Sequence, residues 1–300
     1  MDNLIGRELA GCRLTKLLGK GAIGAVYEAT HTSSQQVMAV KVLSPEAKSL
    51  PGMVERFERE ARLCYQLDHP NVVKVFTWGT TDDGIAYMAM EHVRGATLAQ
   101  MIKALGQLPW PIACAIVSDI AVALRHVHEL DIVHRDIKPG NILVARDGKG
   151  VLADLGLARQ TVGGLDENAG GRLTVPGQAI GSPAYMAPEQ IIDTSSVGPM
   201  ADIYALGATV YAAILGQPPL AADTPNETVR LVMTQTAHPL HLLIPEVPVG
   251  ISNLIAQCLA KEPPDRPASA AEFARQLDDV LRAEGHALGD AREAVRQAEV

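Results

Sequence analysis

Short runs that alternate apolar and polar residues dominate the first part of the chain. They occur within residues 12–43 and again at 72–79 and 85–93, where the Asp-Asp-Gly sequence at 82–84 is typical of a hairpin turn. Alternation of this kind is the pattern of strands that bury one face. It predicts a small unit rich in β-structure.

One helical pattern interrupts these runs. It covers residues 53–66, follows Pro51 and Gly52, and places apolar residues along one face at Met53, Phe57, Ala61 and Cys64. A helix of this kind should pack its apolar face against the strands. The first unit is therefore expected to contain one main helix.

The pattern changes to helices from about residue 94. Helical spacing of apolar residues covers 97–105, 110–130, 200–215, 226–236, 250–260 and 269–283. A short hairpin is predicted at 141–154, whereas residues 160–180 lack periodicity, which in a loop of this length usually indicates function. We therefore expect an α+β protein with these parts: a β-rich domain at 1–93, a larger α-helical domain at 94–283, and a helical or disordered tail at 284–300.

Composition narrows the class of protein. Of the 300 residues, 47% are hydrophobic, and the net charge of −8 argues against nucleic acid or an anionic membrane as the main partner. The four cysteines are scattered without a CxxC pair, which favours reduced thiols over a zinc site. The first residues lack the features of a signal peptide, and the apolar stretches at 111–124 and 203–216 look too short to cross a bilayer. These features predict a cytoplasmic protein with no membrane segment in this chain.

Three glycines stand between the first two β-like runs. Gly19, Gly21 and Gly24 form a G-x-G-x-x-G pattern, in which backbone N–H groups can approach phosphate oxygens closely. A plain turn is an equally good interpretation of the glycines alone. A dinucleotide-binding loop would open a helix and lead to an acidic residue about 20 residues later. Here a β-like run follows, and the next polar residue in range is Lys41.

Lys41 lies in the apolar run Met-Ala-Val-Lys-Val-Leu, where a lysine could simply extend its amine to water. Glu60, at the edge of the apolar face of the helix at 53–66, offers a different explanation. A carboxylate that faces a core is costly unless it is paired. We therefore expect an ion pair between Lys41 and Glu60.

Three polar side chains lie close together in the sequence VHRDIKPGNILV at 133–144. Asp136, Lys138 and Asn141 fit neither a helical face nor strand alternation, so they indicate a loop that directs its side chains toward one point.

The predicted hairpin that follows determines which residue lies opposite Asn141. If Val144 pairs with Val151, then Asn141 lies opposite Asp154. An amide oxygen beside a carboxylate suits a hard cation such as Mg²⁺. The alternative is that Asp154 only caps the turn that follows it.

Three further polar residues are expected to be structural. Asp202 lies in a nearly all-apolar helix, where a buried carboxylate needs partners such as the backbone N–H groups of a neighbouring loop. Glu189 and Arg266 lie in proline-rich settings and could pair with each other.

Taken together, these motifs resemble the eukaryotic-like serine/threonine protein kinases of bacterial type. The ordered set runs from Leu14 to Arg266 and comprises the glycine-rich loop at 19–26, Lys41, Glu60, His134-Arg135-Asp136, Asn141, Asp154-Leu155-Gly156 and Ala187-Pro188-Glu189. The resemblance implies a two-lobed kinase fold, with a small β-rich N-lobe and a larger α-helical C-lobe. It also implies transfer of the ATP γ-phosphoryl group to protein hydroxyls, with Mg²⁺ or Mn²⁺ as the metal.

The resemblance assigns roles to these residues. Lys41, oriented by Glu60, would hold ATP phosphates, and Asn141 and Asp154 would bind the metal. Asp136 would accept or orient the substrate hydroxyl proton, with Lys138 neutralising charge on the transferred group. Further residues would line the nucleotide site: Leu18, Gly19, Gly21, Gly24, Val26, Ala39, Met90, Glu91, Val93 and Leu143.

The chain departs from the family pattern at two positions. Leu155 replaces the usual phenylalanine, and Ser182 replaces a common threonine. Arg135 precedes the catalytic aspartate, which in the family often means that a phosphate on the activation loop binds this arginine. Thr174 is the first candidate for that phosphorylation site and Thr161 the second, although both could be ordinary loop residues.

Two other functions remain open. A pseudokinase scaffold should lack Lys41, Asp136 or Asp154, and all three are present. A small-molecule phosphotransferase would share the catalytic aspartate and asparagine but not the features associated with protein substrates. Expected partners are protein substrates and, for autophosphorylation in trans, a second copy of the chain. The chain is also compatible with being the cytosolic part of a longer, membrane-anchored protein.

Overall fold

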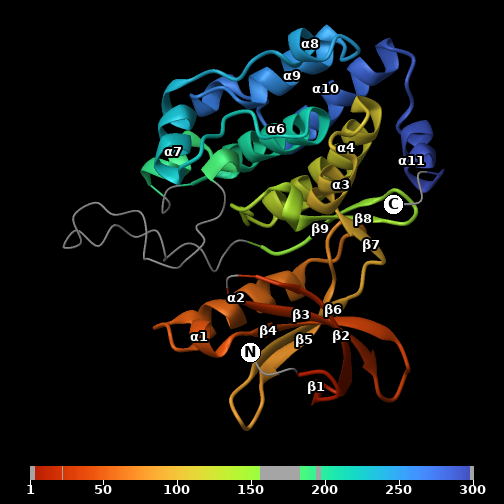
Figure 1. Cartoon of the computed structure of the whole chain (residues 1–300), viewed down its shortest axis with the longest axis vertical. Coiled ribbons are helices and arrows are strands. Elements are labelled where there is room, and N and C mark those ends of the chain that lie inside the picture. The colour runs from red at the N-terminus through yellow and green to blue at the C-terminus, as the bar shows by residue number, and fades with distance from the viewer. Residues whose placement is uncertain (1–3, 22, 156–182, 194–196, 298–300) are drawn as a thin grey trace. The chain divides into compact units, whose positions relative to one another are not determined.

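The structure is a computed structural model that describes residues 4–21, 23–155, 183–193 and 197–297 (Figure 1). The described residues form two compact units. The first contains residues 4–93 and Leu155, and the second contains residues 94–154 and the described residues from 183 onward.

The first unit is built on a six-stranded antiparallel sheet with strand order β1-β2-β3-β4-β6-β5. Its strands are β1 (Glu8–Leu9), β2 (Cys12–Lys20), β3 (Gly24–His31), β4 (Val37–Leu43), β5 (Val75–Thr80) and β6 (Ala86–Glu91). The alternation in the sequence produces this sheet because every second side chain enters one core. That core consists of Leu9, Cys12, Leu14, Ala25, Tyr27, Ala29, Met38, Val40, Val42 and Ala89.

One long helix accompanies the sheet, after the short α1 (Pro45–Lys48). Helix α2 (Met53–Gln66) packs against β5 and β6. It buries the four apolar positions expected from the sequence and also Glu60.

The second unit is mainly helical and carries one small sheet. Its helices are α3 (Leu98–Leu105), α4 (Trp110–Glu129), α5 (Pro188–Ile192), α6 (Pro199–Leu215), α7 (Pro225–Thr234), α8 (Leu240–Leu243), α9 (Val249–Cys258), α10 (Ala270–Ala283) and α11 (Leu288–Gln297). The sheet has the order β7-β8-β9, from β7 (Gly95–Thr97), β8 (Ile142–Ala145) and β9 (Gly150–Leu152). Three short 3-10 helices add to these, at Pro139–Asn141, Pro183–Tyr185 and Pro263–Asp265. Six of the helices were predicted from periodicity, and each begins and ends within two residues of the expected bounds.

Helix α4 corrects one expectation. The stretch at 111–124 looked too short to cross a bilayer, yet the helix that contains it has 20 residues and is apolar enough to do so. Its burial, not its length, identifies it as a core helix. It packs against α6, α10, α11 and β9 (Figure 1). Of the 18-residue apolar window in this helix, 67% is buried.

The predicted register of the 141–154 hairpin was wrong by one residue. Val144 pairs with Gly150, not Val151, and Leu143 pairs with Val151. The reason is the turn, which closes with Gly148 at φ +80° and a hydrogen bond from Ala145 N to Lys149 O of 2.9 Å. This geometry places Ala153, not Asp154, opposite Asn141, and Ala153 N donates to Asn141 O at 2.9 Å.

The close packing of α6 against α9 can be tested by adding a methyl group at their contact. A methyl group on Gly207 of α6 would lie 2.4 Å from Cβ of Cys258 in α9, whereas a methyl group on Gly289 of α11 meets nothing within 4 Å. Gly207→Ala should therefore lower the free energy of unfolding by about 1–3 kcal/mol, the usual effect of overpacking. Gly289→Ala should raise it by roughly 0.5–1 kcal/mol because alanine favours the helix.

Urea unfolding of the two variants beside the parent measures both effects. Equal midpoints for Gly207→Ala and the parent would contradict the described packing of α6 against α9.

Candidate active site

The first unit contains the expected pair of Lys41 and Glu60. Lys41 Nζ lies 3.1 Å from Glu60 Oε1, and the two side chains are 10% and 2% exposed. A salt bridge this deeply buried must hold both charges in a defined geometry, because either charge alone would be costly. The pairing fixes the lysine amine against α2.

The strand register collects several predicted nucleotide-site residues on one face of the sheet. Val26 pairs with Lys41 across β3 and β4, and Ala39 pairs with Met90 across β4 and β6. Directly paired residues point to the same face, as do residues two apart on a strand. Val26, Ala39, Lys41 and Met90 therefore share the face opposite the core that contains Tyr27.

The three predicted glycines differ in what their backbone requires. A Cβ on Gly24 would lie 2.1 Å from Val42 O, so this glycine is needed for the close approach of β3 to β4. A Cβ on Gly19 meets nothing within 4 Å, and one on Gly21 meets only Gly24 O at 3.9 Å. The open space beside Gly19 and Gly21 is what a phosphate-binding loop needs.

Three other predicted residues lie near the ends of strands of this sheet. Leu18 is 39% exposed near the end of β2. The backbone N–H of Glu91 donates to Lys74 O at 2.8 Å, which leaves the Glu91 carbonyl as the group it could offer to a ligand. Val93 is half-buried just beyond β6.

In the second unit, Asp136, Lys138 and Asn141 converge as their spacing predicted. Lys138 Nζ donates to Asp136 Oδ2 at 2.8 Å, and Asn141 Nδ2 donates to the same oxygen at 2.7 Å. Asn141 Nδ2 also donates to the Asp136 carbonyl at 2.8 Å. The aspartate side chain is held from two sides and is still 13% exposed.

Asp202 anchors the loop that carries these residues. Its side chain is fully buried, and its two oxygens accept the backbone N–H groups of His134 at 2.8 Å and Arg135 at 2.7 Å. This is the structural role expected for Asp202. His128 Nε2 lies 2.9 Å from the same carboxylate, and Gln190 Nε2 donates to Arg135 O at 2.7 Å. Sequence reasoning missed both, because nothing in the spacing of His128 or Gln190 points to this loop.

Arg135 adopts a φ of +67°, a region that non-glycine residues rarely occupy. A backbone held there is usually maintained by its surroundings and is common at functional sites. The Asp202 carboxylate supplies that restraint. Arg135 also reaches Val197 O with Nη2 at 3.3 Å.

His134 is neutral within this loop. Complete burial lowers its pKa below the ordinary value of 6.5, outweighing the opposing effects of Asp202 and Asp136. Its Nδ1 accepts the Asp136 N–H at 3.3 Å, so Nε2 carries the proton and donates to Ala153 O at 3.2 Å. The ring thereby ties the loop to the chain just beyond β9.

Asn141 and Asp154 lie at the same end of the β8–β9 hairpin, although not directly opposite each other. Asp154 is exposed and turns out of the strand direction with φ +53°. The hydrogen bonds of Asn141 to Asp136 use Nδ2, which turns Oδ1 toward other partners. Two hard oxygen donors fit Mg²⁺ that also binds phosphate and water. Among the described residues, no group of three or more His, Cys, Asp or Glu could hold a metal.

Of the remaining predicted residues, two lie in the part of the chain that the structure describes and the others lie outside it. Leu143 is half-buried on β8, and Leu155 is buried. The candidate phosphorylation sites Thr174 and Thr161 lie outside the described residues, as do Gly156 and Ser182.

Glu189 and Arg266 form the expected structural pair. Arg266 binds both carboxylate oxygens of Glu189, at 2.6 and 2.8 Å, and lies over the ring of Tyr204 at 5.1 Å. The buried guanidinium also donates to three backbone carbonyls. It fixes the chain around α5 to the start of α6.

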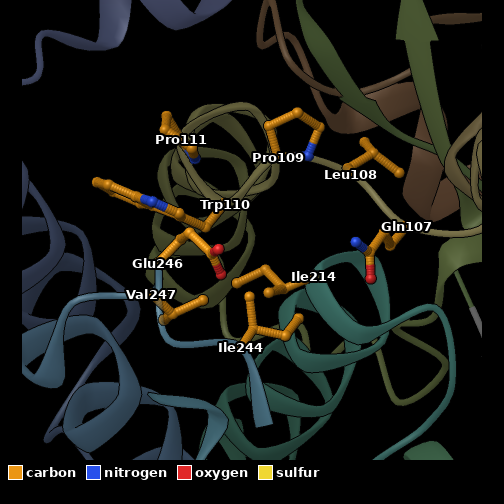
Figure 2. A pocket seen from close by; sticks show the side chains of 9 residues that line it. All are labelled: Gln107, Leu108, Pro109, Trp110, Pro111, Ile214, Ile244, Glu246 and Val247. Carbon is orange, nitrogen blue, oxygen red and sulfur yellow. The ribbon is translucent and has the colours of Figure 1, made fainter. Parts of the chain in front are cut away.

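A separate cavity of about 440 Å³ lies elsewhere in the second unit (Figure 2). It is largely apolar, and the side chains that line it are Gln107, Leu108, Pro109, Trp110, Pro111, Ile214, Ile244, Glu246 and Val247. None of them belongs to the loop at 134–141.

The ion pair in the first unit gives a direct test. Glu60→Leu removes a carboxylate partner of the buried Lys41 ammonium and should lower the free energy of unfolding by about 3–5 kcal/mol. The double variant Lys41→Met/Glu60→Leu removes both charges and should recover most of that loss.

Chemical denaturation of the parent, Glu60→Leu, Lys41→Met and the double variant measures this coupling. Additive losses in the double variant would show that the two charges do not interact.

Comparison with known proteins agrees with this geometry. The model of the protein kinase domain family matches residues 12–277. Serine/threonine-protein kinase PknH of Mycobacterium bovis is 36% identical over 280 residues, which are 93% of this chain and 46% of the relative. Serine/threonine-protein kinase PknE of Mycobacterium tuberculosis is 36% identical over 261 residues, 87% of this chain and 44% of the relative.

A solved structure supports the same assignment. The crystal structure of the Mycobacterium tuberculosis PknI kinase domain matches with a TM-score of 0.71 and 28% identity, covering 93% of this chain and 99% of that one. The chain spans less than half the length of the curated relatives it matches. The family model covers most of the chain, and the relatives exceed 30% identity over nearly all of it, so the chain belongs to the protein kinase family, among its bacterial serine/threonine members.

Proposed function

We propose that this chain is an active protein kinase that transfers the γ-phosphoryl group of ATP to serine or threonine hydroxyls of proteins. The observation that carries the proposal is the Asp136 carboxylate. Lys138 and Asn141 hold it at 2.8 and 2.7 Å in a loop whose backbone is fixed by Asp202. Phosphoryl transfer depends mainly on positioning and electrostatics, which such a restrained constellation supplies.

Each residue of the loop has a task in this proposal. Asp136 orients the acceptor hydroxyl and accepts its proton. Lys138, whose ammonium lies beside that carboxylate, neutralises charge that develops on the transferred group. Asn141 holds Asp136 with its amide nitrogen, and its amide oxygen would be a ligand for the metal.

The proposal assigns nucleotide and metal binding to the following residues. Gly19 and Gly21 leave space for its phosphates, and Lys41, held by Glu60, binds them as a fixed cation. Asn141 and Asp154 would hold Mg²⁺ or Mn²⁺, which would supply positive charge to neutralise the phosphates. Gly24 acts indirectly, by letting β3 approach β4.

The adenine ring would lie on the sheet face shared by Val26, Ala39 and Met90. Leu18 and Leu143 would add apolar contacts. Backbone groups of Glu91 and Val93 would bind the edge of the ring. Nucleotide affinity would therefore come mainly from apolar contact, with few polar groups fixing orientation.

Two alternatives are less well supported. A pseudokinase scaffold is disfavoured because Lys41, Asp136 and Asp154 are all retained in the sequence. A small-molecule phosphotransferase is disfavoured because the relatives are named as protein kinases.

The proposal also includes how the chain is regulated and where in the cell it works. Phosphorylation of Thr174, or secondarily Thr161, would place a phosphate for Arg135 to bind. Transfer between two copies of the chain would make this phosphorylation depend on protein concentration. We propose that the chain works in the cytoplasm, either as a cytoplasmic protein or as the cytosolic part of a longer, membrane-anchored one.

The decisive experiment is incubation with Mg·ATP followed by mapping of phosphorylated residues by mass spectrometry. The parent should acquire phosphate on Ser or Thr, with Thr174 or its neighbours among the sites. Asp136→Asn should lower the rate by about 10²–10⁴-fold, the usual contribution of a general base. Asp223→Asn, which removes the same charge from an exposed position, should match the parent.

Two results would contradict the proposal. Equal phosphorylation of the parent and Asp136→Asn would exclude Asp136 as the catalytic residue. Binding of ATP by the parent without any phosphate transfer to itself or to protein substrates would favour a pseudokinase.

A further inference from the structure

The chain turns back on itself after α10. Gly285, at φ +74°, donates its N–H to Arg282 O at 3.1 Å, and His286 N donates to Leu281 O at 2.9 Å. This pair of hydrogen bonds is the Schellman motif, which ends a helix in a defined direction. The His286 ring then meets Trp110 at the start of α4 edge-on, with centroids 4.7 Å apart. The tail is therefore directed onto α4.

Helix α11 packs on α4 through one face. Leu288 and Arg292 are partly buried and Val295 is 7% exposed, at the spacing that places side chains on one side of a helix. Ala294, next to Val295, is exposed. Figure 1 shows α11 beside α4, at the turn between β8 and β9. The tail at 284–300 was expected to be helical or disordered, and its residues 288–297 are a docked helix.

An ion pair crosses this interface. Arg292 Nη2 binds Asp119 Oδ1 of α4, and the other oxygen, Oδ2, accepts the N–H of Gly150 in β9 at 2.9 Å. Asp119 is 5% exposed, and burial raises its pKa despite these partners. Burial disfavours the ionised carboxylate, and the hydrogen bond from Gly150 and the charge of Arg292 oppose that effect. Asp119 therefore links α11 to β9.

The turn of the hairpin is shaped to receive α11. A Cβ on Gly148 would lie 2.7 Å from Arg292 O and 3.1 Å from Val295 Cβ, so a larger residue would push the helix away. Arg296 Nε also donates to Asp147 O at 3.2 Å. Helix α11 thus contacts the turn through its backbone, an apolar side chain and an arginine.

The other end of the same hairpin carries the proposed metal ligands. Strand β8 follows Asn141 directly, and β9 ends two residues before Asp154. The strands have only four and three residues, and Ala153 N donates to Asn141 O at 2.9 Å. A displacement of the turn would therefore reach the ligand end with little intervening chain to absorb it.

We propose that α11 acts as a clamp: by packing against the turn, it positions the β8–β9 hairpin that lies between Asn141 and Asp154. Arg292 and Asp119 are the positioning residues of this clamp. This inference rests on the proposed function, because it assigns α11 an influence on Asn141 and Asp154. Release of α11 should loosen the hairpin and slow phosphoryl transfer while leaving the fold intact.

Two variants release the clamp in different ways. Val295→Asp puts a charge into the buried contact of α11 with the hairpin turn at Gly148, and Ala294→Asp adds the same charge at the exposed neighbouring position as its control. Arg292→Gln breaks the link to Asp119, and Arg292→Lys retains a charge as a conservative rescue. Thermal unfolding checks that each chain is folded, and Arg292→Gln keeps the test valid if Val295→Asp fails to fold.

The first readout is hydrogen–deuterium exchange without nucleotide or metal, measured on peptides that cover 142–154. Val295→Asp and Arg292→Gln should exchange about tenfold faster than the parent, whereas Ala294→Asp and Arg292→Lys should resemble it. The second readout is steady-state kinetics. The releasing variants should lower kcat about tenfold with little change in KM for the protein substrate.

The outcomes separate this inference from the proposed function. An inactive parent whose hairpin exchanges faster in both releasing variants would overturn the proposed function and keep the contact of α11 with the hairpin. Identical exchange and kcat in Val295→Asp and Ala294→Asp would overturn the clamp. Faster exchange with unchanged kcat in an active enzyme would overturn its positioning role.

Discussion

The buried carboxylate of Asp202 is the interaction on which the rest of the site depends. It lies in the first turn of α6, where the helix dipole favours a negative charge, and it accepts two backbone N–H groups from the loop at 134–141. One of these belongs to Arg135, whose φ of +67° needs a restraint of this kind. The position of Asp136, the next residue, follows from where this backbone is held. The Asp136 carboxylate, which we propose to be catalytic, is thus placed by a second carboxylate that is fully buried.

Buried charged groups also fix the positions of elements elsewhere in the molecule, through ion pairs. Lys41 with Glu60, Arg266 with Glu189 and Arg292 with Asp119 each combine a buried or half-buried charge with a partner from a distant part of the sequence. Such pairs add little net stability, because desolvation offsets most of their attraction. Their value is geometric, since each fixes one element against another in a single arrangement. Phosphoryl transfer depends on how the reacting groups are positioned, so pairs of this kind suit the proposed activity.

Much of the fold was readable from the sequence because periodicity reports which face of an element is buried. Helix α2 and the pairing of Glu60 with Lys41 follow from the apolar face of residues 53–66 and the cost of a lone buried charge. The hairpin register was not readable, because Gly148 and Gly150 could each end the turn, and only Gly148 takes the left-handed conformation that sets the pairing. The docking of α11 was also missed. Its composition predicts a helix, but its partner Asp119 lies far away in the sequence.

The most direct test of this account is the turnover of Asp202→Asn, measured by transfer of phosphate from ATP to a protein substrate. The substitution keeps the shape of the side chain but replaces one acceptor oxygen with an NH₂ group that cannot accept either backbone N–H. The account predicts a folded protein that binds ATP as the parent does, with kcat lowered by about 10²-fold or more because Asp136 is misplaced. A folded Asp202→Asn variant with the parental kcat would contradict it.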